Sequence, residues 1–260
     1  MRDANRFPCH LERAKIVGLP SEIRPIRLCH AVIVAGHAVL KNLADVYSDE
    51  SWCLLDFQRG EPRFYIGHVR RGVELACADP SAVLILSGCQ TRRKAGARSE
   101  GAGYYWLADH LGWFGSPEVR ERAITEEFAR DSFENVLLGI CRFREFAGDW
   151  PEHVTMVSWA FKERRFDMHR EAIRWPRDRY AYDGPNNPED LAQAVASEEQ
   201  ARVRYAADPY SSSEFFQRKR EHRNPFRLQH GYAVSCPEIK DLLAHEGPRV
   251  YAGPLPWDGK

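Results

Sequence analysis

The sequence predicts an α/β protein with a mostly parallel sheet, helices on both faces and a C-terminal extension. Short, continuous apolar runs alternate with segments of helical spacing, as in a series of βαβ units. A strand exposed on one face would instead alternate apolar and polar positions. Crossovers between parallel strands are right-handed, so the helices between such strands cover the sheet.

Three buried strands are expected at residues 31–35, 82–86 and 154–157, and a shorter one at residues 179–182. Helical spacing indicates helices at residues 64–78, 99–111, 161–173 and 188–207. The first of these should stop at Asp79, because a residue before proline disfavours the α conformation. A further helix should begin with Asp131 or Ser132 as its N-cap and present an apolar face as far as Cys141. The segment before that helix is interpreted as a loop.

The alternation divides the chain into a leader (1–27), an α/β core (28–185) and a helical, aromatic-rich C-terminal extension (186–260). Pro-Asn-Asn-Pro at residues 185–188 ends the alternation. In the tail of the extension, Phe226, Tyr232 and Trp257 could dock a partner protein or pack on the core. Packing on the core is favoured, since aromatic residues usually bury against their own domain.

Composition and charge argue against several classes of function. Of the 260 residues 43% are hydrophobic, and 37 basic residues balance 37 acidic ones. Nucleic acids and membrane surfaces are bound through a sustained positive field, so neither is expected as a partner. The basic clusters at residues 92–94 and 218–220 are interpreted as solvated faces or local anion contacts. Seven cysteines without a Cys-x-x-Cys pair, and no visible signal peptide, favour reduced thiols and a cytoplasmic location.

Polar residues follow three of the expected strands. His37 follows the first strand, Ser-Gly-Cys-Gln-Thr at residues 87–91 ends the second, and Ser158 ends the third. Open parallel sheets bind ligands at the carboxyl ends of their strands. Turns of small and polar residues leave backbone N–H groups free, which suits a phosphate or a carboxylate. A small-molecule ligand is therefore expected at this edge of the sheet.

Side chains near these strand ends also suit an anion. Arg92 and Arg130 could each hold one with two parallel hydrogen bonds, and Ser87 and Thr91 could donate hydroxyl bonds to it. The loop carries neither a Walker lysine nor Gly-x-Gly-x-x-Gly. Taken alone, it is therefore also typical of a plain strand-to-helix turn.

His37, Glu100 and Asp131 are the candidate catalytic residues. Imidazole titrates near neutrality, and with a carboxylate it could perform acid–base chemistry. His37 is equally consistent with a core histidine satisfied by a neighbouring carbonyl, and Asp131 with a helix cap. Paired carboxylates with His37 could also hold a divalent cation, but no residues have a diagnostic metal-ligand spacing, so no metal is assigned and metal dependence stays open.

The order of several short motifs resembles that of the DUF218 family. The core motifs are Ser-Gly-Cys-Gln-Thr-Arg at 87–92, Ser-Glu at 99–100, Thr-Glu-Glu at 125–127, Ala-Arg-Asp-Ser at 129–132 with Asn135, and Val-Ser at 157–158 with Phe-Lys-x-x-Arg-Phe at 161–166. The fungal, cytosolic branch is closer, through Gly-His-Ala at 36–38, Arg-Asn-Pro-Phe at 223–226, His-Gly-Tyr at 230–232, Ser-Cys-Pro at 235–237 and Gly-Pro-Leu-Pro-Trp at 253–257. The resemblance covers roughly residues 28–185 for the family and nearly the whole chain for the branch.

The resemblance implies a Rossmann-like, three-layer αβα fold and a nucleotide-type ligand, since one bacterial relative is reported to bind S-adenosylmethionine. It implies no established reaction. Together with the strand ends, the motifs add six residues to the expected ligand site: Gly88, Gln90, Glu126, Ser132, Asn135 and Arg165.

Two positions depart from the family pattern. Cys89 replaces the second glycine of Ser-Gly-Gly, and Gly101 replaces the alanine of Ser-Glu-Ala. The first change should reshape the ligand loop, and the second should loosen the start of the following helix. A thiolate at Cys89, beside a helix start and Arg92, could be activated in this lineage alone.

The sequence is thus consistent with two functions. The first is a small-molecule enzyme that acts on an anionic or nucleotide-like polar ligand by acid–base chemistry, in a role such as specialised metabolism. The second is a non-catalytic binding or sensor protein for a nucleotide-like ligand such as S-adenosylmethionine. The sequence selects neither a reaction class nor an oligomeric state.

Overall fold

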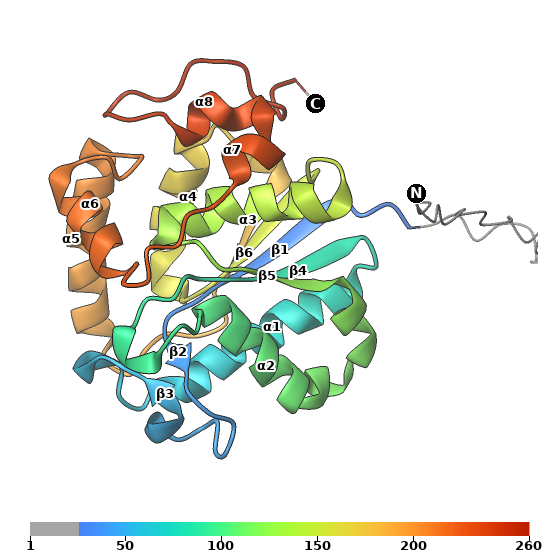
Figure 1. The fold of residues 1–260 in the computed structure, drawn as a ribbon, viewed down its shortest axis with the longest axis vertical. Helices are drawn as coiled ribbons and strands as arrows, with labels where there is room; N and C mark the ends of the chain where they lie inside the picture. The colour runs from blue at the N-terminus through green and yellow to red at the C-terminus, as the bar shows by residue number, and fades with distance from the viewer. Residues whose placement is uncertain (1–25, 260) are drawn as a thin grey trace, which may run out of the picture.

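A five-stranded parallel sheet lies at the centre of the protein. The computed structural model describes residues 26–259, so the leader expected at residues 1–27 falls almost entirely outside the described residues. The sheet has the order β5-β4-β1-β6-β7 (Figure 1). Its strands are β5 (Ala123–Glu126), β4 (Ala82–Ser87), β1 (His30–Ala35), β6 (His153–Val157) and β7 (Tyr180–Asp183). The expected α/β class with a mostly parallel sheet between helical layers is confirmed.

The three strands expected from the apolar runs are neighbours. Ala31 of β1 pairs with Val83 of β4 on one side and with Val154 of β6 on the other, and both pairings are parallel. These runs are apolar because both faces of the sheet are covered, so that every residue of β4 is buried. The fourth expected strand is observed as β7, beside β6.

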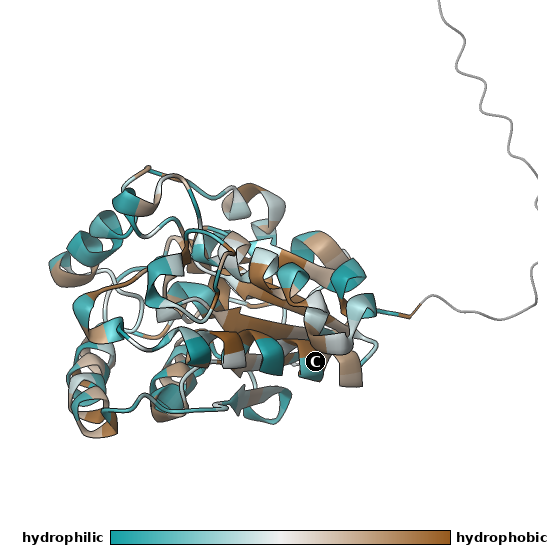
Figure 2. Ribbon diagram, turned by 90° about the horizontal axis from the view of Figure 1, so that it is seen from below, coloured by the Kyte–Doolittle hydropathy of each residue, from teal (hydrophilic) through white to brown (hydrophobic). Residues whose placement is uncertain are grey.

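Helices cover both faces of the sheet, and Figure 2 shows the hydrophobic strands between the helical layers. The four helices are α1 (Pro62–Ala78), α2 (Glu100–His110), α3 (Ser132–Ala147) and α4 (Glu163–Ala172). α1 and α2 share one core with Val32 and Leu84, whereas α3 and α4 share the other with Ile33 and Ile85. Adjacent strand residues point to opposite faces, so β1 and β4 supply both cores. Within residues 26–259, no helix combines the length and the apolar character that a bilayer crossing requires.

The C-terminal extension packs on the α/β core. Its helices are α5 (Leu191–Ala207), α6 (Glu214–His222), α7 (Tyr232–Ser235) and α8 (Lys240–Leu243). α5 and α6 stand at the side of the sheet where the strands end, and α7 lies over α3 (Figure 1). Tyr232 and Trp257 are buried in the core of α3 and α4, and the indole of Trp257 donates to the carbonyl of Ile173 at 2.9 Å. These two aromatic side chains therefore pack on their own protein.

Two local features differ from the expected pattern. The segment interpreted as a loop before α3 contains β5, which pairs in parallel with β4 at the edge of the sheet. β5 has only four residues, Ala-Ile-Thr-Glu, and so lacks a long apolar run. In addition, β2 (Val39–Leu40) and β3 (Trp52–Cys53) form a separate antiparallel pair after β1.

The strand order sets where a ligand site can form. From β1 the chain moves to β4 and β5 on one side, and it then returns to β6 and β7 on the other. The order therefore reverses between β1 and β6. In doubly wound sheets, the crevice outside the carboxyl ends of the strands at such a switch point is the usual ligand site.

Candidate functional site

A polar chamber opens at this switch point, and we call it the inner chamber. Its volume is about 140 Å³, and the ends of β1 and β6, the first residues of α3 and part of α6 border it. Nine of the residues expected at the ligand site line it: His37, Arg92, Glu100, Arg130, Asp131, Ser132, Asn135, Ser158 and Arg165. The structure thus brings together polar side chains that are widely separated in the sequence.

Five other expected residues lie outside the chamber lining: Ser87, Gly88, Gln90, Thr91 and Glu126. The hydroxyl of Ser87 is fully buried and donates to Glu126 Oε2 at 2.7 Å. The amide of Asn135 donates to the same hydroxyl at 2.8 Å. Ser87 and Glu126 therefore form a buried brace behind the chamber. The expectation that Ser87 and Gln90 face the ligand is wrong.

Glu100 occupies a slot that two glycines leave open. A Cβ atom on Gly36 or Gly88 would come within 2.7 or 2.8 Å of Glu100 Oε2. Gly88 also has a φ of +154°, a conformation that favours glycine. Within the slot, Thr91 donates to Glu100 Oε1 at 2.5 Å, and burial raises the pKa of the carboxyl group. Glu100 thus presents the chamber with a carboxyl group that protonates readily.

Six cationic side chains surround the same space: Arg92, Arg130, Lys162, Arg165, Lys219 and Arg223. Arg165 is paired with Glu198 at 3.2 Å. Within residues 26–259, Arg92, Lys162, Lys219 and Arg223 form no ion pair with a carboxylate. Burying unpaired positive charge is costly, and an anion in the chamber would compensate it.

Asp131 is held in a different way. Its carboxylate caps α3 by accepting from the backbone N–H of Glu134 at 3.0 Å, and it pairs with Arg220 at 2.7 Å. The Arg220 guanidinium holds the pKa of Asp131 well below its usual range, against the effect of burial. Arg130 pairs with Glu134 at 2.5 Å, so four charges form one network. Asp131 therefore stays ionised. The observed contacts of Asp131 are those of a helix cap that fixes Arg220, and its assignment as a catalytic residue stays a prediction.

His37 lies among aromatic rings. The ring centroids of His68, Tyr65 and Trp159 are 5.1, 5.4 and 5.8 Å from its own. Its Nε2 lies 3.3 Å from the hydroxyl of Ser158. Burial, and then the positive charge of Lys162, lower the pKa of His37 well below its usual range. A neutral imidazole therefore faces the chamber, ready to accept a hydrogen bond.

The two departures from the family pattern have structural reasons. Cys89 is fully buried, and burial raises the pKa of its thiol to about 12, so the expected activation of this thiol is not found. A Cβ on Gly101 would lie 2.5 Å from the carbonyl oxygen of Leu86 and 2.8 Å from that of Glu126. Glycine thus lets α2 start against the ends of two strands. The helix start is capped by Ser99, which accepts from Ala102 N, and is not loosened.

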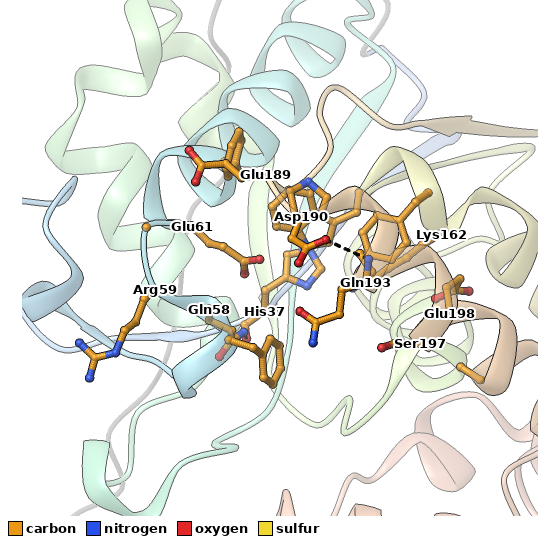
Figure 3. A pocket seen from close by; sticks show the side chains of 18 of the residues that line it. His37, Gln58, Arg59, Glu61, Lys162, Glu189, Asp190, Gln193, Ser197 and Glu198 are labelled. Carbon is orange, nitrogen blue, oxygen red and sulfur yellow. Dashed lines mark hydrogen bonds between the residues drawn. The ribbon is translucent and has the colours of Figure 1, made fainter.

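A larger cavity of about 590 Å³ adjoins the inner chamber, and we call it the outer groove. The residues that line both cavities are His37, Phe57, Gln58, Lys162 and Arg165. Phe64, Trp159 and Phe161 give the groove aromatic walls, and Figure 3 shows the polar side chains among them. Glu198 Oε1 is buried there without a hydrogen-bond partner in the described part of the chain. The groove therefore suits a flat or apolar group that also carries a hydroxyl or amino donor.

Several chamber residues did not emerge from the sequence. Lys219 of α6 and Arg223, the residue after α6, line the chamber, and Arg220 of α6 pairs with Asp131 beside it. Lys219 and Arg220 belong to the basic cluster interpreted as a solvated face or a local anion contact. Arg218 of that cluster is exposed, whereas Lys219 and Arg220 are turned inward. Residues 26–259 contain no group of three or more His, Cys, Asp or Glu side chains placed to hold a metal ion.

Comparison with known proteins gives one similar curated protein. The chain is 28% identical over 241 residues to the uncharacterised protein YOR238W of Saccharomyces cerevisiae, in an alignment that covers 73% of this chain and 79% of the yeast protein. No family model matches the chain, and no solved structure matches it. The likeness to the yeast protein extends over most of both chains, but it carries no functional information.

Proposed function

We propose that this protein is a small-molecule enzyme that acts on an anionic ligand by acid–base chemistry in the inner chamber. The supporting observation is that four cations, Arg92, Lys162, Lys219 and Arg223, line a chamber of about 140 Å³ and have no carboxylate partner among residues 26–259. Charge-assisted hydrogen bonds to a phosphate or carboxylate are among the strongest polar contacts in proteins. The volume suits one such group together with the reacting atoms.

Two side chains supply the proposed acid–base chemistry. Glu100 donates a proton to a developing or leaving oxygen, because burial raises the pKa of this carboxyl group. His37 accepts a proton from a ligand hydroxyl, because its imidazole is neutral. Binding of an anion nearby favours the imidazolium that results.

The outer groove supports a nucleotide-like ligand. An aromatic ring can pack against Phe64, Trp159 and Phe161, and a hydroxyl or amino group can donate to Glu198 Oε1. The resemblance to the DUF218 family also favours a nucleotide-type ligand, and it suggests S-adenosylmethionine as a candidate. The cations of the inner chamber would hold the carboxylate of that molecule, but they would repel its sulfonium charge. A phosphate-bearing ligand therefore fits better.

We also propose a cytoplasmic location. All six cysteines within the described residues are free. Free thiols are typical of reducing compartments. Fractionation of cells that express a tagged chain tests this, and recovery in a secreted or vesicular fraction would contradict it.

Calorimetry with inorganic phosphate, adenosine monophosphate and pyruvate tests the anion site. Arg223→Gln should weaken binding of the tightest of these about tenfold to a hundredfold, which corresponds to the roughly 1.5–3 kcal/mol of a hydrogen bond to a charged group. Arg218→Gln is the matched control, since Arg218 lies near Arg223 but is exposed and pairs with Glu214. Equal effects of the two substitutions would contradict the site.

Untargeted mass spectrometry of a cell extract separates an enzyme from a binding protein. Incubation with the wild-type protein should deplete one anionic metabolite and produce another, and Glu100→Gln should not. If the metabolite is retained on the protein but never converted, the non-catalytic binding or sensor function replaces the enzyme.

A further inference from the structure

Lys162 lies at the junction of the inner chamber and the outer groove, and it lines both. It precedes the first residue of α4 and follows the turn that ends β6 at the switch point of the sheet. Figure 3 shows it from the groove, with Gln193 and Glu198 of α5 nearby. Any ligand that spans the two cavities must pass this side chain.

The ammonium group of Lys162 forms no ion pair with a carboxylate of the described residues. Its Nζ atom forms neither an ion pair nor a hydrogen bond with any residue from 26 to 259, and it lies 5.4 Å from the ring centroid of Phe161. The nearby carboxylate of Glu198 is already paired with Arg165. Burial and the positive charges of Arg165 and Arg223 lower the pKa of Lys162 to about 7, against the opposing charges of Glu198 and Glu61. Desolvation beside other cations is how enzymes obtain a neutral, nucleophilic lysine.

We propose that Lys162 is the nucleophile of this site and forms an imine with a carbonyl carbon of the anionic substrate. This inference rests on the proposed anion site, because the cations of the inner chamber would hold the acid group and so place the carbonyl beside Lys162. The substrate class is therefore a small carbonyl compound that carries a carboxylate or a phosphate.

The step balances with groups that line the cavities. The nitrogen lone pair of Lys162 forms a bond to the carbonyl carbon, the C=O π bond breaks, and a proton moves from nitrogen to oxygen to give a carbinolamine. Glu100 then protonates the hydroxyl, which leaves as water. The remaining N–H proton passes to the Glu100 carboxylate as the C=N bond forms. No oxidant, reductant or metal takes part.

Lys219 is the other lysine near this space, and its position is less suited. It lines the inner chamber but not the outer groove, and burial and the neighbouring arginines lower its pKa less far, to about 8. Its place among the cations fits a contact to the acid group of the ligand. The geometry therefore distinguishes a reacting lysine from a binding one.

Borohydride trapping of the full chain tests the inference. Glyoxylate is the carboxylate probe and glyceraldehyde 3-phosphate the phosphate probe, and peptide mass mapping locates the reduced adduct. The better probe should label Lys162 at least about tenfold faster than the exposed Lys94 near neutral pH, because burial lowers the pKa of Lys162 and the chamber cations hold the probe beside it. Inorganic phosphate should suppress labelling at Lys162 alone. The probe that labels faster identifies the acid group.

Lys162→Arg keeps the positive charge but cannot form the imine. It should abolish the phosphate-sensitive adduct while inorganic phosphate still raises the melting temperature, and Lys94→Arg should leave the adduct unchanged. An adduct that persists in Lys162→Arg, or that maps to Lys219, overturns the inference while leaving the anion site intact. If phosphate neither stabilises the wild-type protein nor protects Lys162, the proposed anion site itself is contradicted.

Discussion

Two carboxylates face the inner chamber from the starts of two different helices, and their surroundings differ. Glu100, the first residue of α2, lies in a glycine-lined slot. There its carboxyl group accepts a hydrogen bond from the uncharged hydroxyl of Thr91. Asp131, the N-cap of α3, pairs with Arg220 and accepts from a backbone N–H. The pKa of Glu100 is raised and that of Asp131 is lowered.

This difference shows that position at a strand end does not decide what a carboxylate does. Both residues are buried, so desolvation alone would raise both pKa values. The cation at Asp131 outweighs its desolvation, whereas the cations near Glu100 do not. The Glu100 carboxyl group therefore takes up a proton more readily than that of Asp131. Four substitutions test this comparison.

The largest effect is expected for Glu100→Gln, which keeps the shape of the side chain but removes its acidic proton. The metabolite conversion found in the extract assay should slow about a hundredfold to ten-thousandfold. The free energy of unfolding, measured by urea titration, should change little, because the amide oxygen still accepts from Thr91. Equal turnover in the variant would remove Glu100 from the acid–base chemistry.

Asp131→Asn should lower the stability of the fold. Asparagine still caps α3, but Arg220 loses its closest counter-ion, so the free energy of unfolding should fall by about 3–5 kcal/mol. Asp190→Asn is the matched control: Asp190 caps α5 through Gln193 N without an ion pair, and the loss there should stay below about 1 kcal/mol. Similar losses would mean that the cap, and not the cation, determines the role of Asp131.

Glu126 extends the comparison to a buried carboxylate that lies outside the chamber lining. Burial raises its pKa from 4.5 to about 7, although Ser87 and two backbone N–H groups donate to it. A raised pKa stabilises the fold at low pH, and this contribution is lost as pH rises through the folded-state value. Between about pH 4.5 and 7, the wild-type protein should lose roughly 3 kcal/mol relative to Glu126→Gln. Urea titrations across this range measure the difference, and parallel curves would contradict the raised pKa.

The smallest effect is expected for Gly88→Ala, which narrows the slot of Glu100. The new methyl group would meet the Glu100 carboxylate, and the φ of +154° is strained for alanine, so about 2 kcal/mol of stability should be lost. Gly96→Ala is the control, because Gly96 also has a positive φ but no atom within 4 Å of its Cβ position. The Gly96→Ala variant should lose less stability, about 1 kcal/mol. If thermal melts show the same loss at both glycines, the slot is not tightly packed.

The fold was largely predictable because its signals are local. The strands at residues 31–35 and 82–86 are short apolar runs buried on both faces, and Asp131 is a strong N-cap. β5 was not predicted, because its four residues lack a long apolar run and form a strand by pairing with β4. The expectation that polar side chains gather at the strand ends rested on the same local signals.

The chamber itself was only partly predictable. Lys219 of α6 and Arg223, just after it, line the chamber, and Arg220 of α6 reaches Asp131. The spacing of charges along a helix does not reveal which ones turn toward a distant cavity. The sequence therefore did not reveal that Asp131 pairs with Arg220. Ser87 was misassigned because a hydroxyl at a strand end can serve an internal brace as well as a ligand.

The place of α6 in the chain also affects when a newly made molecule can work. The ribosome completes all five strands of the sheet before it reaches Lys219 and Arg223. A nascent chain can thus assemble the glycine slot and Glu100 while the cations of α6 are still to come. Trp257, which helps to anchor the extension, is synthesised later still. The proposed anion site is therefore completed only after the whole sheet has been synthesised.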